Sequence, residues 1–289
     1  MKIGVLAFIT ETTVDAATFA RKAESLGFDA FYLPEHPVIP VVRKSAYPAS
    51  ADGVMPEALA HFIDPFIGLA QAAAVTSRIE LGTGICLVPE HHPLILAKEI
   101  ATLDLYSRGR FIFGIGAGWL TEESAVMGVD FKRRWPITRE YIRAMKELWT
   151  RAEASFEGEF LKFPAVKCYP KPFRKPHPPV QIGATGAGAV RERALRDTVA
   201  IGDGWAPIGL SPEVLAGELG KLKKMCADAG REYTQLEIVM YLPAVEDEPR
   251  RVREQYQEAG AHRLVFALDA PSPDSWERQL TDLAQAWIA

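Results

Sequence analysis

Residues 79–115 decide the fold, because they hold a strand, a helix and a second strand in direct succession. The stretch opens with Ile-Glu-Leu-Gly-Thr-Gly-Ile-Cys-Leu at 79–87 and ends with Arg-Phe-Ile-Phe-Gly-Ile at 110–115. Between the two, residues 94–106 repeat apolar side chains at the spacing of an amphipathic helix. The second strand is largely apolar on both faces, as strands buried in a parallel sheet are. The stretch therefore predicts a βαβ unit.

The same alternation continues in both directions along the chain. With the unit above, the sequence predicts eight strands and eight helices in turn. That order predicts an α/β fold, a single (β/α)8 TIM barrel of residues 1–289, with an open doubly wound sheet as the alternative. The other predicted strands are 2–8, 28–33, 180–184, 200–206, 236–242 and 263–268, and the other helices are 14–26, 65–74, 138–151, 188–197, 212–229, 248–259 and 272–287.

Two insertions interrupt the alternation. Residues 37–62 follow the second predicted strand and are rich in Pro, Ala and Val. In a barrel this segment lies at the C-terminal face, where active sites are found, so we expect it to cover a pocket. Residues 152–179 join the fourth helix to the fifth strand at the opposite face, and we expect packing rather than chemistry from them.

The composition is typical of a soluble protein of the cytoplasm. The formal net charge is -4 and no block of Lys and Arg stands out, so we expect no nucleic-acid-binding surface. Cys86, Cys168 and Cys226 lie far apart without metal-binding spacing, which favours reduced thiols. No apolar run approaches the roughly 18 residues of a membrane span, and the first strand is too short for a signal peptide.

The second predicted strand ends in an acid and an imidazole side by side. Glu35 and His36 enter the first insertion, and polar residues at this end of a barrel strand are candidates for chemistry. A histidine, which titrates near neutral pH, can give a proton to a bound substrate or take one from it. The alternative is structural: His36 bonds a loop carbonyl and Glu35 pairs with an arginine.

Glycines interrupt the third and fourth strands. Gly82 and Gly84 indicate a bulge, a close approach by a flat ligand, or small residues that fit the taper of the barrel. The glycines within 114–118 lack the spacing of a dinucleotide-binding loop, so we interpret them as room at the barrel mouth, with Trp119 lining it. Cys86 is interpreted as a small buried hydrophobe rather than a nucleophile.

Two other pairs of polar residues have a structural interpretation. Glu122 and Glu123 could reach the pocket, but we expect solvated carboxylates at a helix start. His91 and His92 should point to opposite sides, and no cluster of carboxylates accompanies them in the sequence. We therefore expect no metal site.

The fifth strand runs into a glycine-rich turn, Val-Gln-Ile-Gly-Ala-Thr-Gly-Ala-Gly at 180–188. Gly183, Gly186 and Gly188 expose backbone N–H groups at a helix N-terminus, and Thr185 adds a hydroxyl group. These features predict a phosphate-binding site. The alternative is that Thr185 only caps the helix.

The sixth predicted strand ends in Asp203, Gly204 and Trp205, which we interpret as a tight turn and an aromatic wall, with a structural role as the alternative for Asp203. Together with Phe8 and Trp119, Trp205 would line the barrel mouth. Such a lining favours an apolar or aromatic small molecule.

Six motifs occur in order along the chain: LGTGICLVP, HHPLILAKEIATLDLYSRGRFIFGIGAGW, WPITREY, SFEGEF, PPVQIGATG and IGDGW. Together they resemble the luciferase-like monooxygenase superfamily, and more narrowly its branch of F-420-dependent oxidoreductases. The resemblance that they carry extends from Lys2 to about Pro207, nearly the whole chain. The resemblance is specific for the superfamily and much less so for the coenzyme or the substrate.

The resemblance implies where a coenzyme and the chemistry would lie. A flavin or deazaflavin ring would cross the barrel mouth over a bulge in the third strand, with a non-prolyl cis peptide at Gly84-Ile85. His36, with Glu35, would occupy the catalytic position, although many relatives have Asp before this His. A Gly-Ala-Thr turn also replaces the commoner Gly-Gly. The coenzyme phosphate would lie on Gly183, Ala184, Thr185, Gly186 and Gly188.

These implications give three functional hypotheses. The first is hydride transfer between coenzyme F-420 and a small organic substrate, with His36 as proton donor or acceptor. The second is a monooxygenase that uses reduced FMN and oxygen, and the third is a flavin-binding barrel without turnover. The resemblance also implies a homodimer.

Overall fold

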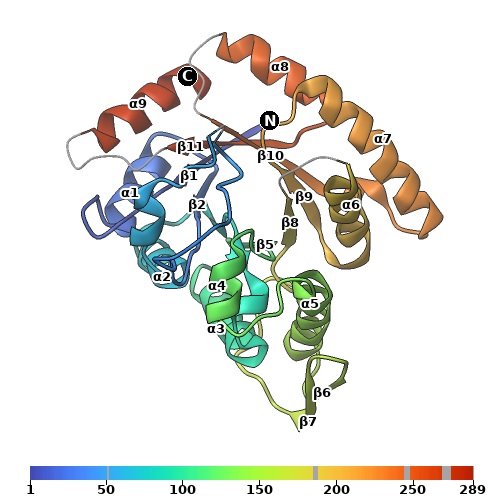
Figure 1. Cartoon of the computed structure of the whole chain (residues 1–289). Coiled ribbons are helices and arrows are strands. Elements are labelled where there is room, and N and C mark those ends of the chain that lie inside the picture. Colours follow the sequence, from blue (N-terminus) through green and yellow to red (C-terminus); the bar gives the residue numbers. More distant parts are fainter. Residues whose placement is uncertain (51, 185–187, 244–247, 269–274, 289) are drawn as a thin grey trace.

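Eight parallel strands of the described residues close into a barrel, with helices around its outside (Figure 1). The computed structural model describes residues 1–50, 52–184, 188–243, 248–268 and 275–288. The sheet runs β3-β2-β1-β11-β10-β9-β8-β5, and β3 also pairs with β5, which completes the ring. The predicted (β/α)8 fold is therefore confirmed.

The barrel strands are β1 (Lys2–Ala7), β2 (Ala30–Leu33), β3 (Glu80–Thr83), β5 (Phe111–Gly116), β8 (Val180–Ala184), β9 (Gly204–Pro207), β10 (Glu237–Pro243) and β11 (Arg263–Leu268). The covering helices are α1 (Ala16–Ser25), α2 (Pro65–Val75), α3 (Pro93–Tyr106), α5 (Arg134–Thr150), α6 (Ala189–Ile201), α7 (Pro212–Asp228), α8 (Pro249–Ala259) and α9 (Trp276–Trp287). Short elements between them include β4 (Cys86–Leu87), α4 (Thr121–Val126) and three 3-10 turns: η1 (Glu57–His61), η2 (Val88–Glu90) and η3 (Tyr233–Gln235).

The boundary between α6 and β9 differs from the prediction. The strand predicted at 200–206 begins only at Gly204, because α6 continues to Ile201. Leu195 and Ile201 are both buried, so the apolar face of the helix extends past the predicted end. This shift places Asp203 before the strand instead of near its C-terminal end.

The insertion at 152–179 contains an antiparallel hairpin of β6 (Ala154–Glu157) and β7 (Lys162–Val166). The buried carboxylate of Glu140 on α5 accepts hydrogen bonds from three backbone N–H groups in the turn of this hairpin, those of Glu159, Phe160 and Leu161. The hairpin is thus tied to a covering helix, as expected for a segment that contributes packing.

A buried ion cluster fills the N-terminal end of the barrel. Arg263 begins β11, and its side chain is 0% exposed. It donates a hydrogen bond to the Tyr32 hydroxyl at 2.9 Å, and it forms ion pairs with Glu237 at 3.0 Å and with Glu80. The interior above this cluster is apolar and is made by Leu6, Ala30, Tyr32, Ile112, Ala206, Val239, Tyr241 and Val265.

The third barrel strand contains one extra residue. Gly82 pairs with Ile112 and Cys86 with Ile115, so four steps on this strand match three on β5. The predicted bulge is therefore confirmed, and so is the cis peptide bond at Gly84-Ile85.

The bulge pushes atoms into the neighbouring strands, and glycines make room for them. A Cβ at Gly114 would lie 2.0 Å from the carbonyl oxygen of Thr83. A Cβ at Gly116 or at Gly183 would lie 2.2 or 2.6 Å from the Ile85 side chain. Glycine is therefore required at these positions by packing.

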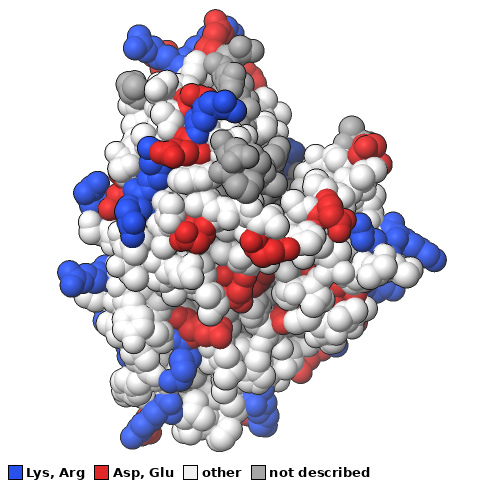
Figure 2. Space-filling model, turned by 90° about the vertical axis from the view of Figure 1, so that its left-hand side faces the viewer, with Lys and Arg blue, Asp and Glu red and all other residues white. Residues whose placement is uncertain are grey.

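Charged side chains of both signs are distributed over the surface drawn in Figure 2, with acidic groups across its centre and Lys and Arg mostly around its edge. Of the helices that the structure describes, none has both the length and the apolar character to cross a bilayer.

Replacement of Gly114 by Ala tests the requirement set by the bulge. We expect Gly114→Ala to lower the free energy of unfolding by about 3 kcal/mol, or to prevent folding, because the neighbouring carbonyl belongs to the backbone and cannot rotate away. Gly217→Ala is the matched control. Gly217 lies on an exposed face of α7 with open space around it, so this change should raise stability by about 0.5–1 kcal/mol. Equal urea midpoints for the two variants would contradict the packing argument.

Candidate functional site

His36 is held by a buried carboxylate at the C-terminal end of the barrel. β2 ends at Leu33, and His36 follows in the turn beyond it. Its Nδ1 lies 2.8 and 3.1 Å from the two carboxylate oxygens of Glu123, and the two side chains are only 8% and 0% exposed. Because a carboxylate can only accept, Nδ1 is the donor of this bond. Nε2 is then the atom of the ring that can exchange a proton with a ligand.

Aromatic rings surround the imidazole of His36. Phe62 lies against it with ring centroids 6.2 Å apart, and Trp119 meets it edge-on at 5.9 Å. Phe62 in turn contacts Phe8 at 5.1 Å, and Trp119 contacts Tyr47 at 5.5 Å. Tyr47 and Phe62 come from the insertion at 37–62, so this segment lies over His36 as expected.

The expectation that Glu122 and Glu123 are merely solvated is wrong. Glu123 is fully buried against His36, and Glu122 ties down the insertion. The Glu122 carboxylate accepts the backbone N–H groups of Lys44 and Ser45, and these bonds lower its pKa to about 2. Both residues follow the C-terminal end of β5, and this strand-end placement was the signal that could have marked them.

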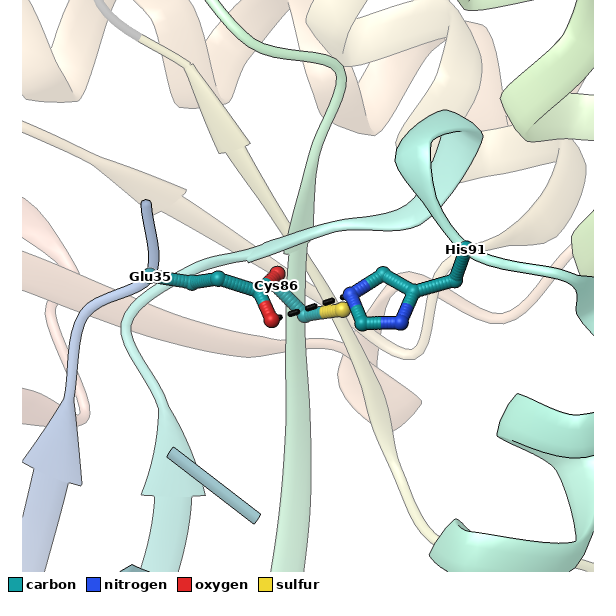
Figure 3. Close-up of side chains that lie close together, drawn as sticks. All are labelled: Glu35, Cys86 and His91. Carbon is teal, nitrogen blue, oxygen red and sulfur yellow. Dashed lines mark hydrogen bonds and ion pairs between the residues drawn. The ribbon is translucent and has the colours of Figure 1, made fainter. Parts of the chain in front are cut away.

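Glu35 does not share the environment of His36. Consecutive extended residues point to opposite sides, and the Glu35 carboxylate turns toward α3. One oxygen accepts the backbone N–H of Leu87 at 2.6 Å, and the other accepts from Nε2 of His91 at 2.9 Å (Figure 3). Burial alone would lower the pKa of His91, but the hydrogen bond and the charge of Glu35 raise it. Glu35 therefore fixes the chain after the bulge and does not lie with His36, and the alternative, in which Glu35 pairs with an arginine, is also wrong.

Cys86 lies beside this pair, and the ligand atoms of Glu35, Cys86 and His91 fall within 4.8 Å of one another (Figure 3). Both Glu35 oxygens are already in use, and no fourth His, Cys, Asp or Glu of the described chain joins the group. Burial, and next the charge of Glu35, raise the pKa of the Cys86 thiol well above its usual value. We therefore describe the group as a hydrogen-bonded cluster with a neutral thiol.

The predicted coenzyme residues gather in part around the bulge. The Gly84 N–H donates to the Leu33 carbonyl at 2.8 Å, three residues before His36, and Ile85 packs against Gly183. Gly188, with φ of 57°, precedes the first turn of α6. Ala184 ends β8, whereas Thr185 and Gly186 lie outside the described residues.

Asp203, Gly204 and Trp205 lie away from His36, contrary to the prediction. The Asp203 carboxylate accepts the N–H of Val180, the first residue of β8, so it lies at the N-terminal end of the barrel. Gly204 pairs with Gln181 at the same end. Trp205 is buried in the apolar layer between strands and helices and does not line the mouth.

Glu90 is a further buried acid near the site, and no pattern in the sequence selects it. Its carboxyl group accepts a hydrogen bond from the Ser124 hydroxyl at 3.0 Å. Burial, and next the charge of Glu123, raise the pKa of Glu90 to about 8. Glu90 thus bonds a residue next to Glu123 in the chain, and Glu123 is the carboxylate that holds His36.

Proteins similar in sequence to this chain include a redox enzyme. An uncharacterized protein of Mycobacterium tuberculosis is 39% identical over 276 residues, which cover 95% of this chain and 94% of that protein. An F420-dependent glucose-6-phosphate dehydrogenase of Kineococcus radiotolerans is 33% identical over 181 residues, 61% of this chain and 48% of that enzyme.

Solved structures with the same fold include the monooxygenase RslO1 from Streptomyces bottropensis, with a TM-score of 0.75, 21% identity, and coverage of 99% of this chain and 98% of that one. An F420-dependent secondary alcohol dehydrogenase gives a TM-score of 0.76 at 18% identity, and the match covers 99% of this chain and 97% of that one. The family profile described as luciferase-like monooxygenase matches residues 1–285. The chain therefore belongs to the luciferase-like monooxygenase family of F420- or FMN-dependent oxidoreductases.

Proposed function

We propose that this protein transfers a hydride between coenzyme F-420 and a small organic substrate, with His36 as the group that exchanges the proton. The observation that carries the proposal is the His36–Glu123 pair at the C-terminal end of the barrel, framed by Phe62 and Trp119. A positioned imidazole with a buried carboxylate behind it is a common arrangement for general acid–base catalysis.

The residues around the bulge fit a flat coenzyme with a phosphate tail. Gly84 and Ile85 follow the end of β3 next to β2, where a ring could lie in front of His36. At the other end of the proposed site, a Cβ at Gly188 would meet no atom within 4 Å, so a phosphate can approach the N-terminus of the thirteen-residue α6. Phe8, Gly183, Ala184, Thr185 and Gly186 complete the proposed binding residues.

The coenzyme, when bound, supplies the hydride acceptor or donor. For an alcohol substrate, Nε2 of His36 takes the hydroxyl proton as the carbon loses its hydride and the C=O bond forms. The Glu123 carboxylate stabilises the resulting imidazolium and keeps the ring oriented. The surrounding rings exclude water and strengthen this electrostatic interaction. They also favour an apolar or aromatic substrate.

The Kineococcus relative supports F-420 as the coenzyme. A second candidate is an FMN-dependent monooxygenase. It is supported by the oxygenase component of a flavin-dependent trigonelline monooxygenase of Acinetobacter baylyi, which is 37% identical over 123 residues, 42% of this chain.

We further propose a cytoplasmic homodimer, for which the exposed Ile67 on α2 and Ile95 on α3 offer an apolar contact surface.

Titration of the purified protein with F-420 and with FMN, followed by coenzyme fluorescence, tests the choice of coenzyme. We expect F-420 to bind at least about tenfold more tightly than FMN, a difference of roughly 1.4 kcal/mol. Tighter binding of FMN would favour the second candidate, an FMN-dependent monooxygenase, and oxygen consumption would be the next assay. Binding of neither coenzyme would contradict the proposed site.

Replacement of His36 tests its role in proton exchange. We expect His36→Ala to lower kcat by about 10²–10⁴-fold, the usual contribution of a general acid or base, with little change in coenzyme affinity. His92→Ala is the matched control, because this imidazole is exposed before α3 and makes no capping hydrogen bond. Full activity of the His36 variant would refute the assignment.

A further inference from the structure

Glu90 has one carboxyl oxygen for which the fold provides no partner. Glu90 ends η2, directly after the bulge, and the residue is 7% exposed. Its Oε1 accepts from Ser124, whereas Oε2 is buried without a hydrogen-bond partner among the described residues. A carboxylate anion with an unsatisfied buried oxygen is costly, because burial removes the water that would solvate its charge. The neutral acid is the form that suits this position.

The two carboxylates that face Glu90 both favour its neutral form. Glu123 and Ser124 are neighbours on α4, so the carboxylate that holds His36 belongs to the same short helix as the hydroxyl bonded to Glu90. The charges of Glu123 and Glu35 both disfavour ionisation of Glu90, whereas that of His91 favours it. His91 is already paired with Glu35, so the net effect of its surroundings is to keep a proton on Glu90.

We propose that Glu90 is a proton-holding residue that sets the charge of the Glu123–His36 pair. The inference rests on the proposed function of His36. While Glu90 is neutral, the imidazole can lose and regain its proton against the single charge of Glu123. When Glu90 ionises, a second negative charge stabilises the imidazolium, so the ring holds its proton more tightly. Glu90 acts through Glu123 and is a positioning residue, since it touches no ligand in this scheme.

The direction of the pH effect follows from this arrangement. Glu90 loses its proton as the pH rises through about 8, so above that pH its negative charge should act on the His36–Glu123 pair. Glu90→Gln keeps the shape of the side chain and cannot ionise. Ser124→Ala removes the hydrogen bond that favours the ionised form of Glu90, so in this variant Glu90 should lose its proton at a higher pH.

The test is a titration of the coenzyme-free protein labelled with ¹⁵N in its histidines. The chain has six histidines, and the His36 signal is identified by its loss in His36→Ala. In the unmodified protein we expect the ¹⁵N chemical shift of His36, plotted against pH, to show an inflection near pH 8 that reports the ionisation of Glu90. The inflection should vanish in Glu90→Gln, move to higher pH in Ser124→Ala, and stay unchanged in the control Glu254→Gln, whose side chain is exposed on α8.

Persistence of the inflection in Glu90→Gln, or its absence from the unmodified protein, would overturn the proposal. Because the titration needs no coenzyme, its result does not depend on whether F-420 or FMN binds. Once a turnover assay exists, a change in the pH profile of kcat in Glu90→Gln, relative to the unmodified protein, provides the second readout. An unchanged profile would show that Glu90 is only a structural partner of Ser124.

Discussion

The extra residue in the third barrel strand is the constraint on which the rest of the structure depends. It forces the Thr83 carbonyl and the Ile85 side chain into space that β5 and β8 would otherwise fill, and glycines at 114, 116 and 183 accept them. Those glycines are separated from the bulge by up to about a hundred residues of sequence. They are required by the packing of one strand against two others, before any ligand is considered.

The bulge also divides the residues around it into two groups. Glu35 holds the chain that leaves the bulge, through Leu87 and His91, while the adjacent His36 faces the opposite way toward Glu123. One group supports the chain after the bulge, and the other contains the residue that we propose exchanges a proton. Aromatic rings from the insertion and from the end of β5 separate the second group from solvent.

The sequence predicts the barrel, the bulge and the importance of His36, because each depends on a local pattern: alternating periodicity, glycines within a strand, and a polar residue at a strand end. It fails for Asp203, because a helix that runs a few residues longer moves this aspartate to the other end of the barrel. It also selects Glu35 instead of Glu123 as the partner of His36. The contact between His36 and Glu123 joins residues 87 positions apart, and no periodicity in the sequence encodes it.

The ion cluster around Arg263 has a consequence for how ligands could enter and leave the barrel. Because Arg263, Glu80, Glu237 and Tyr32 fill the N-terminal end of the barrel, a ligand of the proposed site would have to enter and leave at the C-terminal end. The barrel would then be a blind-ended vessel, and a coenzyme and a substrate would share its single opening.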